Sequence, residues 1–250
     1  MIRIILCVIF VLVFFICSIP LYLIVLLVGL FNRRARDIMA LRIVQWAFGV
    51  VGFLAGAKVT YIGEENIPKN EAVLYIGNHR GFFDIILTYK NCPDLTGYVS
   101  KKEIKKVPFL NFWMMFLHCL FLDRSNIKEG LKTIKQAIEQ VNRGISICIF
   151  PEGTRNTVEG TLLPFKEGSF RIAVKSGCPI VPMAISGTSA IFEDHLPFLR
   201  AGKVTVIYGK PFRVKDLPEE DRKHPGAYTQ RVMQEMLDAM KEQPKTNPET

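Results

Sequence analysis

The chain has 250 residues, of which 49% are hydrophobic, and its formal net charge is +9. This length fits one sizeable domain with an appendage. A basic chain can attract nucleic acid, an anionic membrane or an anionic substrate, but no segment here resembles a nucleic-acid-binding module, so we expect no nucleic-acid partner.

The first predicted element is a long apolar helix over residues 4–31, a stretch of 28 residues without a charge. A spanning helix needs roughly 20 apolar residues, whereas the apolar part of a secretory signal has about 7–15. Three arginines follow the segment (Arg33, Arg34 and Arg36), and one, Arg3, precedes it. The positive-inside rule therefore predicts that the downstream chain lies in the cytoplasm. Pro20 leaves a re-entrant hairpin open as the alternative to a span.

A second apolar stretch, residues 43–57, is short for a span and contains Trp46, a residue type enriched at headgroup level. It predicts an interfacial helix in or against one leaflet, with a core helix of the soluble domain as the alternative. Residues 1–57 together predict an anchor in the cell membrane. A basic domain beside such an anchor is expected to face anionic lipid.

From residue 58 to 241 the sequence predicts one α/β domain, a mostly parallel or mixed sheet flanked by helices. Amphipathic helices are predicted over 128–144 and 226–242. The polar tail, residues 242–250, is predicted to be disordered. Short runs rich in Val, Ile and Tyr predict strands at 58–63, 72–77, 97–100, 145–150, 179–186 and 203–209.

The stretch "NHRGFFD", residues 78–84, follows the second predicted strand and holds His79 and Asp84 five positions apart. On one helix they would be turned about 140° from each other. A turn that places His79 before a helix and Asp84 in its first turns brings them together, and Gly77 and Gly81 permit such a turn. The pair then suits a general base whose tautomer is fixed by a carboxylate. By itself the motif also fits an ordinary turn.

The metal interpretation is weaker, because His118, His195 and His224 are not at ligand spacing and no cysteine accompanies them. The six cysteines form no C-x-x-C pair and are interpreted as reduced thiols that pack as small hydrophobes. They are Cys7, Cys17, Cys92, Cys119, Cys148 and Cys178.

Three further polar blocks follow apolar runs: "FPEGTR" (150–155), "FLDRS" (121–125) and the lysine-rich "VSKKEIKKVPFL" (99–110). Sites in open α/β sheets collect outside the carboxyl ends of the strands. The motifs "NHRGFFD" and "FPEGTR", which each follow a predicted strand, are therefore expected to share one cleft. Arginine and lysine near strand ends can bind a phosphate, although a surface ion pair or a solvated face explains each block alone.

Taken in order, these blocks resemble the glycerolipid acyltransferase family, and within it most closely the 1-acyl-sn-glycerol-3-phosphate acyltransferases. The family's N-H-x4-D block matches residues 78–84, its F-x-D-R block matches 121–124 and its F-P-E-G-T-R block matches 150–155. A proline-containing strand at 180–185 completes the set. The resemblance covers about residues 58–212.

The resemblance implies a transfer of an acyl chain from acyl carrier protein or coenzyme A to the 2-hydroxyl of lysophosphatidic acid, which gives phosphatidic acid. It implies that His79 is the base and that Asp84 orients it. The acceptor phosphate would be held by Arg155, with Lys101 and Arg124. Glu152 and Gly153 would also belong to the substrate-binding site, where Glu152 would position the turn or the acceptor. Neither a cofactor nor a metal is expected.

Two alternatives stay open at this point. One is a sister enzyme that acylates glycerol-3-phosphate or another lysophospholipid with the same residues. The other is an inactive membrane scaffold of the same fold, against which the presence of both His79 and Asp84 argues.

Overall fold

The computed structural model describes residues 1–123 and 125–242; Arg124 and the predicted disordered tail from 243 onward lie outside the described residues. The chain begins with two long helices, α1 (Ile2–Phe31) and α2 (Arg33–Ala55). The side chain of Asn32 accepts a hydrogen bond from the backbone of Ala35 and so caps α2. Helix α2 starts at Arg33 rather than at residue 43, because the charged stretch before the apolar run contains no helix breaker.

A seven-stranded sheet forms the centre of the molecule, in the order β1-β7-β6-β2-β5-β3-β4. β6 and β7 pair antiparallel, and every other neighbouring pair is parallel. The mixed α/β sheet predicted from the sequence is confirmed, including all six predicted strands; β4 was not predicted, since three residues carry too little pattern. The strands are β1 (Ala57–Ile62), β2 (Leu74–Gly77), β3 (Thr96–Lys101), β4 (Leu120–Leu122), β5 (Ser146–Ile149), β6 (Ile180–Ser186) and β7 (Gly202–Tyr208).

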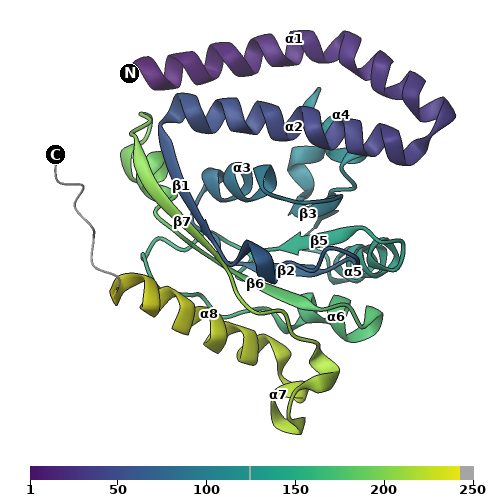
Figure 1. Ribbon diagram of the computed structural model, residues 1–250, viewed down its shortest axis with the longest axis vertical. Helices are drawn as coiled ribbons and strands as arrows, with labels where there is room; N and C mark the ends of the chain where they lie inside the picture. Colours follow the sequence, from purple (N-terminus) through teal and green to yellow (C-terminus); the bar gives the residue numbers. More distant parts are fainter. Residues whose placement is uncertain (124, 243–250) are drawn as a thin grey trace.

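Helices cover both faces of the sheet (Figure 1). Helix α3 (Phe82–Lys90) lies on one face, α2 packs on α3, and α1 forms the outermost layer on α2. Helices α5 (Ile127–Asn142), α6 (Arg171–Ser176) and α8 (Pro225–Glu242) lie on the opposite face. The other α-helices of the described residues are α4 (Leu110–Phe116) and α7 (Glu219–Lys223).

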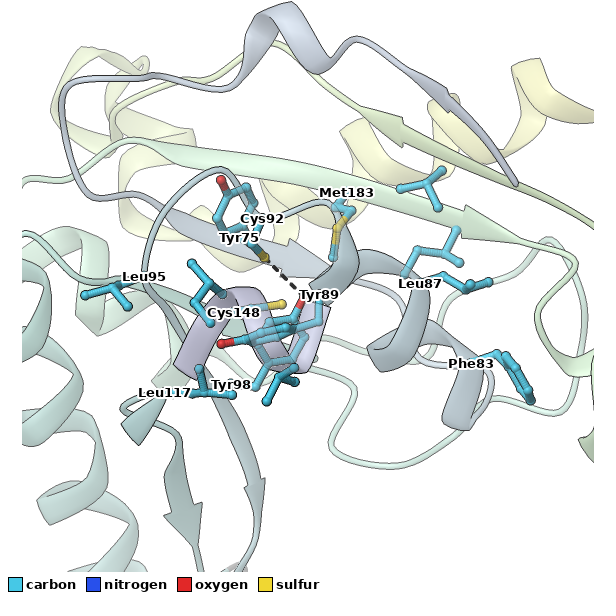
Figure 2. Close-up of a cluster of buried hydrophobic side chains, with 14 of the residues drawn as sticks. Tyr75, Phe83, Leu87, Tyr89, Cys92, Leu95, Tyr98, Leu117, Cys148 and Met183 are labelled. Carbon is cyan, nitrogen blue, oxygen red and sulfur yellow. Dashed lines mark hydrogen bonds between the residues drawn. The ribbon is translucent and has the colours of Figure 1, made fainter. Parts of the chain in front are cut away.

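The core has two halves because alternate strand residues point to opposite faces of the sheet. Tyr75 and Cys148 join the half under α3, which Figure 2 shows as a close cluster with residues of that helix. Leu74 and Ile147 join the half under α5, α6 and α8. With both faces buried, the central strands read as continuous apolar runs.

All six cysteines are free thiols. Cys92 and Cys148 lie in the core, and Cys119 is partly buried against it; burial raises the pKa of Cys92 to about 11 and that of Cys119 to about 12, and raises the pKa of Cys148 as well. At neutral pH they are therefore uncharged packing groups.

Helices α1 and α2 are each long and apolar enough to cross a membrane. Helix α1 leaves most of its apolar side chains exposed, among them Ile16, Leu23 and Leu30. Its middle is nevertheless tied to α4: the indole of Trp113 donates to Ser18 Oγ at 2.9 Å. The helical hairpin formed by α1 and α2 thus lies along the domain rather than projecting away from it (Figure 1).

Candidate active site

Two connections meet at the carboxyl edge of the sheet, one after β2 and one after the neighbouring strand β5. The backbone N–H of Asn156 donates to the carbonyl of His79 at 2.8 Å, which ties the second connection to the first. Asn78 secures the first connection on its other side, since its side chain accepts from the N–H of Ile185 and donates to the carbonyl of the same residue. The two motifs expected to lie together are therefore joined by a fixed backbone frame.

His79 and Asp84 are in direct contact: Nδ1 of the imidazole lies 2.7 Å from Oδ2 of the carboxylate. His79 is in the turn and Asp84 is the third residue of α3, as the spacing predicts. An ionised carboxylate only accepts hydrogen bonds, so Nδ1 carries the proton and Nε2 is the acceptor nitrogen. The imidazole side chain is 13% exposed and stacks on the ring of Phe150 at 4.6 Å between centroids. This arrangement suits a general base.

The Asp84 carboxylate is fully buried and receives four hydrogen bonds. Oδ2 accepts from His79 Nδ1 and from the backbone N–H groups of Arg80 and Gly81, at 2.6 and 2.7 Å for the two backbone donors. Oδ1 accepts from the hydroxyl of Thr188. Donors on both oxygens stabilise the ionised form and fix its rotamer, so the carboxylate is preorganised to hold an imidazolium.

Glu152 joins the two connections through hydrogen bonds from its carboxylate. Its side chain is buried, Oε1 accepts from the backbone N–H of His79 and Oε2 from that of Leu163, both at 2.8 Å. Burial raises the pKa of Glu152, and the two hydrogen bonds oppose that rise. Of the two roles left open for Glu152, positioning of the turn is the one that these contacts support.

Gly77, directly before the first motif, and Gly81 within it leave space for neighbouring side chains rather than supply a left-handed backbone. Gly81 has an extended conformation, with φ −166°. A Cβ at Gly81 would lie 2.3 Å from the carboxylate of Glu193, and one at Gly77 would lie 2.7 Å from the ring of Phe150. Gly153 differs, because its φ of +71° is in the region that favours glycine.

Arg155 lies beside the start of α3. Its guanidinium sits 4.0 Å above the ring of Phe82, and Nη1 is 3.9 Å from Oε1 of Glu193. The side chain is 40% exposed. Phe82 is half exposed as well, whereas its neighbour Phe83 belongs to the buried core. An accessible guanidinium stacked on an aromatic ring presents its donors outward, which suits an anionic ligand.

The other predicted phosphate ligands are less closely placed. Lys101 is exposed at the end of β3, two strand positions from β2, or about 10 Å at the usual strand spacing. Arg124 lies outside the described residues. Asp123, the acidic residue of the F-x-D-R block, accepts from Lys102 Nζ at 2.5 Å and from Ser125. The lysine and the serine together lower the pKa of Asp123 to about 2.

The structure adds three site residues that the sequence did not single out. Arg80 is buried, and its guanidinium donates to the carbonyl of Asn156 at 2.7 Å and lies 2.7 Å from Glu159. Thr188 contacts Asp84, and Glu193 accepts from the N–H of Phe82 at 2.8 Å. Thr188 and Glu193 follow β6 without a motif of their own, so only the folded chain reveals them.

A second histidine–aspartate pair serves as a comparison within the same molecule. Nε2 of His118 lies 2.8 Å from Oδ2 of Asp37, and Arg36 contacts the other oxygen of the same carboxylate. His118 precedes β4, so it lies at the amino edge of the sheet, whereas His79 follows β2 at the carboxyl edge. The two pairs are therefore on opposite edges of the sheet.

Comparison with known proteins gives concordant results. Residues 58–186 match the acyltransferase family. The chain is 33% identical over 197 residues to a 1-acyl-sn-glycerol-3-phosphate acyltransferase of Saccharomyces cerevisiae, a match that covers 78% of this chain but only 64% of that relative. It is 31% identical to the enzyme of the same name from Haemophilus influenzae, over 80% of this chain and 82% of the relative.

A solved structure is also similar. The crystal structure of the 1-acyl-sn-glycerophosphate (LPA) acyltransferase PlsC from Thermotoga maritima superposes with a TM-score of 0.73 at 25% identity. The superposition covers 96% of this chain and 97% of that one. The similarity therefore extends over the N-terminal helices as well as the sheet.

Proposed function

The chain belongs to the acyltransferase family, and from that premise we propose that it is a 1-acyl-sn-glycerol-3-phosphate acyltransferase. It transfers an acyl chain from acyl carrier protein or coenzyme A to the sn-2 hydroxyl of 1-acyl-sn-glycerol-3-phosphate, and the product is phosphatidic acid. The observation that carries the proposal is the 2.7 Å contact between His79 and Asp84 at the strand edge that also presents Arg155.

In the proposed reaction, Nε2 of His79 takes the proton of the acceptor hydroxyl as its oxygen attacks the thioester carbonyl. The carbon–oxygen ester bond forms, the carbon–sulfur bond breaks, and the thiolate leaves. The imidazolium then returns the proton to that sulfur. Asp84 stabilises the imidazolium between these two steps, because its carboxylate already faces Nδ1. A base of this kind contributes about 10²–10⁴ to the rate.

We assign the acceptor phosphate to Arg155. A guanidinium matches a phosphate with two parallel hydrogen bonds, and the stack on Phe82 holds this one flat at the mouth of the site. Lys101 would add longer-range attraction from the end of β3. Arg124 is also proposed to attract the acceptor phosphate, but it lies outside the described residues.

We further infer that α1 and α2 hold the domain at the cytoplasmic face of the cell membrane. The exposed apolar side of α1 would lie among acyl chains, and its hydrogen bond to α4 through Ser18 favours an in-plane hairpin over a perpendicular span. Arg33 at the hairpin turn would face anionic headgroups, whereas Arg34 pairs with Asp94 at 2.7 Å. The acceptor hydroxyl could then reach His79 while the lipid chain stays in the bilayer.

The direct test is an assay of the purified protein in detergent micelles. Lysophosphatidic acid, glycerol-3-phosphate and monoacylglycerol are each offered with a panel of acyl carrier protein and coenzyme A thioesters. We expect phosphatidic acid from lysophosphatidic acid at a rate well above that with the other two acceptors. Preference for glycerol-3-phosphate would assign the sister activity, and no product from any pairing would refute the proposal.

A further inference from the structure

The connection between β6 and β7, residues 187–201, crosses the start of α3 and contacts the active site at several points. It lies beyond residue 186, where the match to the acyltransferase family ends. The family blocks in the sequence therefore do not account for its contacts with His79's neighbours.

Thr188 makes the deepest of these contacts. The residue is fully buried, and its hydroxyl donates to Oδ1 of Asp84, the carboxylate oxygen that does not face His79. The other oxygen, Oδ2, already accepts from His79 and from two backbone N–H groups. If the Thr188 hydroxyl were removed, Oδ1 would stay buried but would lose this hydrogen bond, because the other three donors are all on Oδ2. Loss of a hydrogen bond to a buried charged oxygen is costly.

The rest of the connection fixes the position of Thr188 relative to the first motif. Ser189 Oγ accepts from the guanidinium of Arg80 at 2.9 Å and donates to Asp194 at 3.1 Å. Glu193 accepts from the N–H of Phe82 at 2.8 Å. Gly187, with φ +86°, lets the chain turn into this position directly after β6. The connection between β6 and β7 thus forms hydrogen bonds with residues 80, 82 and 84.

We propose that Thr188 is a positioning residue for the base pair, acting on His79 through the carboxylate of Asp84. The inference rests on the proposed function for its kinetic consequences, but its structural content concerns the histidine–aspartate pair alone. The hydroxyl holds the carboxylate in the rotamer that faces Nδ1 and takes up part of its negative charge. Without that hydroxyl, the charge would be shared only among His79 and the two backbone N–H groups on Oδ2, so the protonated imidazole would be favoured and the carboxylate less firmly oriented.

Two substitutions separate this role from simple packing. Thr188→Val keeps the shape and removes the donor, whereas Thr188→Ser keeps the donor and removes a methyl group. Thr229→Val is the matched control, because Thr229 is also fully buried and its hydroxyl donates to the carbonyl of Pro225 within α8, away from the pair. Asp84 contacts the imidazole of His79 and Glu152 accepts from its backbone N–H, and both charged residues are retained in all of these variants.

The first readout needs no catalysis: histidine-selective NMR follows the titration of His79 in micelles. We expect Thr188→Val to move its midpoint upward by about 0.3–1 pH unit, a size typical of one changed interaction. Thr188→Ser and Thr229→Val should leave the midpoint in place. The second readout is transfer: Thr188→Val should lower kcat by about 10-fold or more, the loss expected for a hydrogen bond to a charged group, with little change in acceptor KM. The acid limb of its pH–rate profile should move in the same direction as the NMR midpoint.

An unchanged midpoint and an unchanged kcat in Thr188→Val would overturn the inference. So would equal losses in the valine and serine variants, because the methyl group and not the donor would then matter. If the unaltered protein shows no transfer but its His79 midpoint still responds to Thr188→Val, the proposed function fails while the positioning of the pair stands.

Discussion

Replacement of Asp84 by asparagine separates the charge of this residue from its shape. Oδ2 accepts from the N–H groups of Arg80 and Gly81, so an amide nitrogen at that position would face two donors. The amide oxygen should therefore take the Oδ2 position, where it can still accept from His79 Nδ1. The amide nitrogen would then face Thr188, whose hydroxyl can turn and accept. The asparagine variant is thus expected to keep both the fold and the tautomer of His79.

The expected loss of kcat in Asp84→Asn then follows from the removed charge alone. An imidazolium about 4 Å from a carboxylate gains up to about 4 kcal/mol at an effective dielectric constant of 20. A neutral amide retains a hydrogen bond of about 1 kcal/mol in its place. The difference of about 3 kcal/mol corresponds to a drop of about 10²-fold in kcat. Loss of the correct tautomer would cost more, about 10⁴-fold in the analogous substitution of serine proteases.

The assay combines initial rates of phosphatidic acid formation with NMR of the imidazole nitrogens. We expect a rate of about 1% of the unaltered protein and a proton that stays on Nδ1. Asp84→Ala is the contrasting variant, because it leaves the N–H groups of Arg80 and Gly81 without their acceptor and should unfold more easily. The reasoning is refuted if Asp84→Asn keeps more than about a third of the rate, or if the proton moves to Nε2.

Three further outcomes are expected. Arg155→Ala should lower kcat/KM for lysophosphatidic acid by about 10–150-fold, the value of a charge-assisted bond, and should hardly affect monoacylglycerol; equal losses for both acceptors would contradict the phosphate assignment. Deletion of residues 1–36 should release part of the protein from vesicles and weaken its activity on bilayer substrate, whereas full activity would show the segment to be dispensable. In thiol titration at pH 8, the exposed Cys17 should react in the folded protein, whereas Cys92, Cys119 and Cys148 should react only after unfolding, because burial raises their pKa; fast labelling at any of these three positions in the folded protein would contradict the reasoning.

The sequence predicts the sheet well because its strands carry a strong local signal. Buried strands such as 146–149 and 180–186 are short apolar runs bounded by glycine or proline, and both were predicted to within a residue or two. Strand β4 was missed because Leu120–Leu122 is too short to show a period. The start of α2 was misplaced because residues 33–42 are rich in charge and do not continue the apolar run, although no helix breaker interrupts them and Arg36 packs on Phe116 of α4.

The site was predictable where its residues share a motif. The spacing of His79 and Asp84 requires a strand–turn–helix, and the structure has that arrangement. The motif could not indicate Thr188 or Glu193, which contact the same turn from more than 100 positions away along the chain. It also left the reason for Gly81 open, because the side chain that fills the space beside it belongs to Glu193. Contacts of this kind arise from topology, which no local pattern encodes.

The central claim is that His79 is the base, and the molecule supplies its own control in His118. Both imidazoles contact a buried aspartate, at 2.7 and 2.8 Å, but they lie at opposite edges of the sheet. Asparagine suits both positions, including the φ of +56° at His118. The measurement is the initial rate of acyl transfer to lysophosphatidic acid by His79→Asn and His118→Asn. Both variants are assayed at a temperature well below the Tm measured for each of them. We predict a loss of about 10²–10⁴-fold for His79→Asn and a rate within about two-fold of the unaltered protein for His118→Asn. Transfer by His79→Asn at more than a tenth of the unaltered rate would contradict the account.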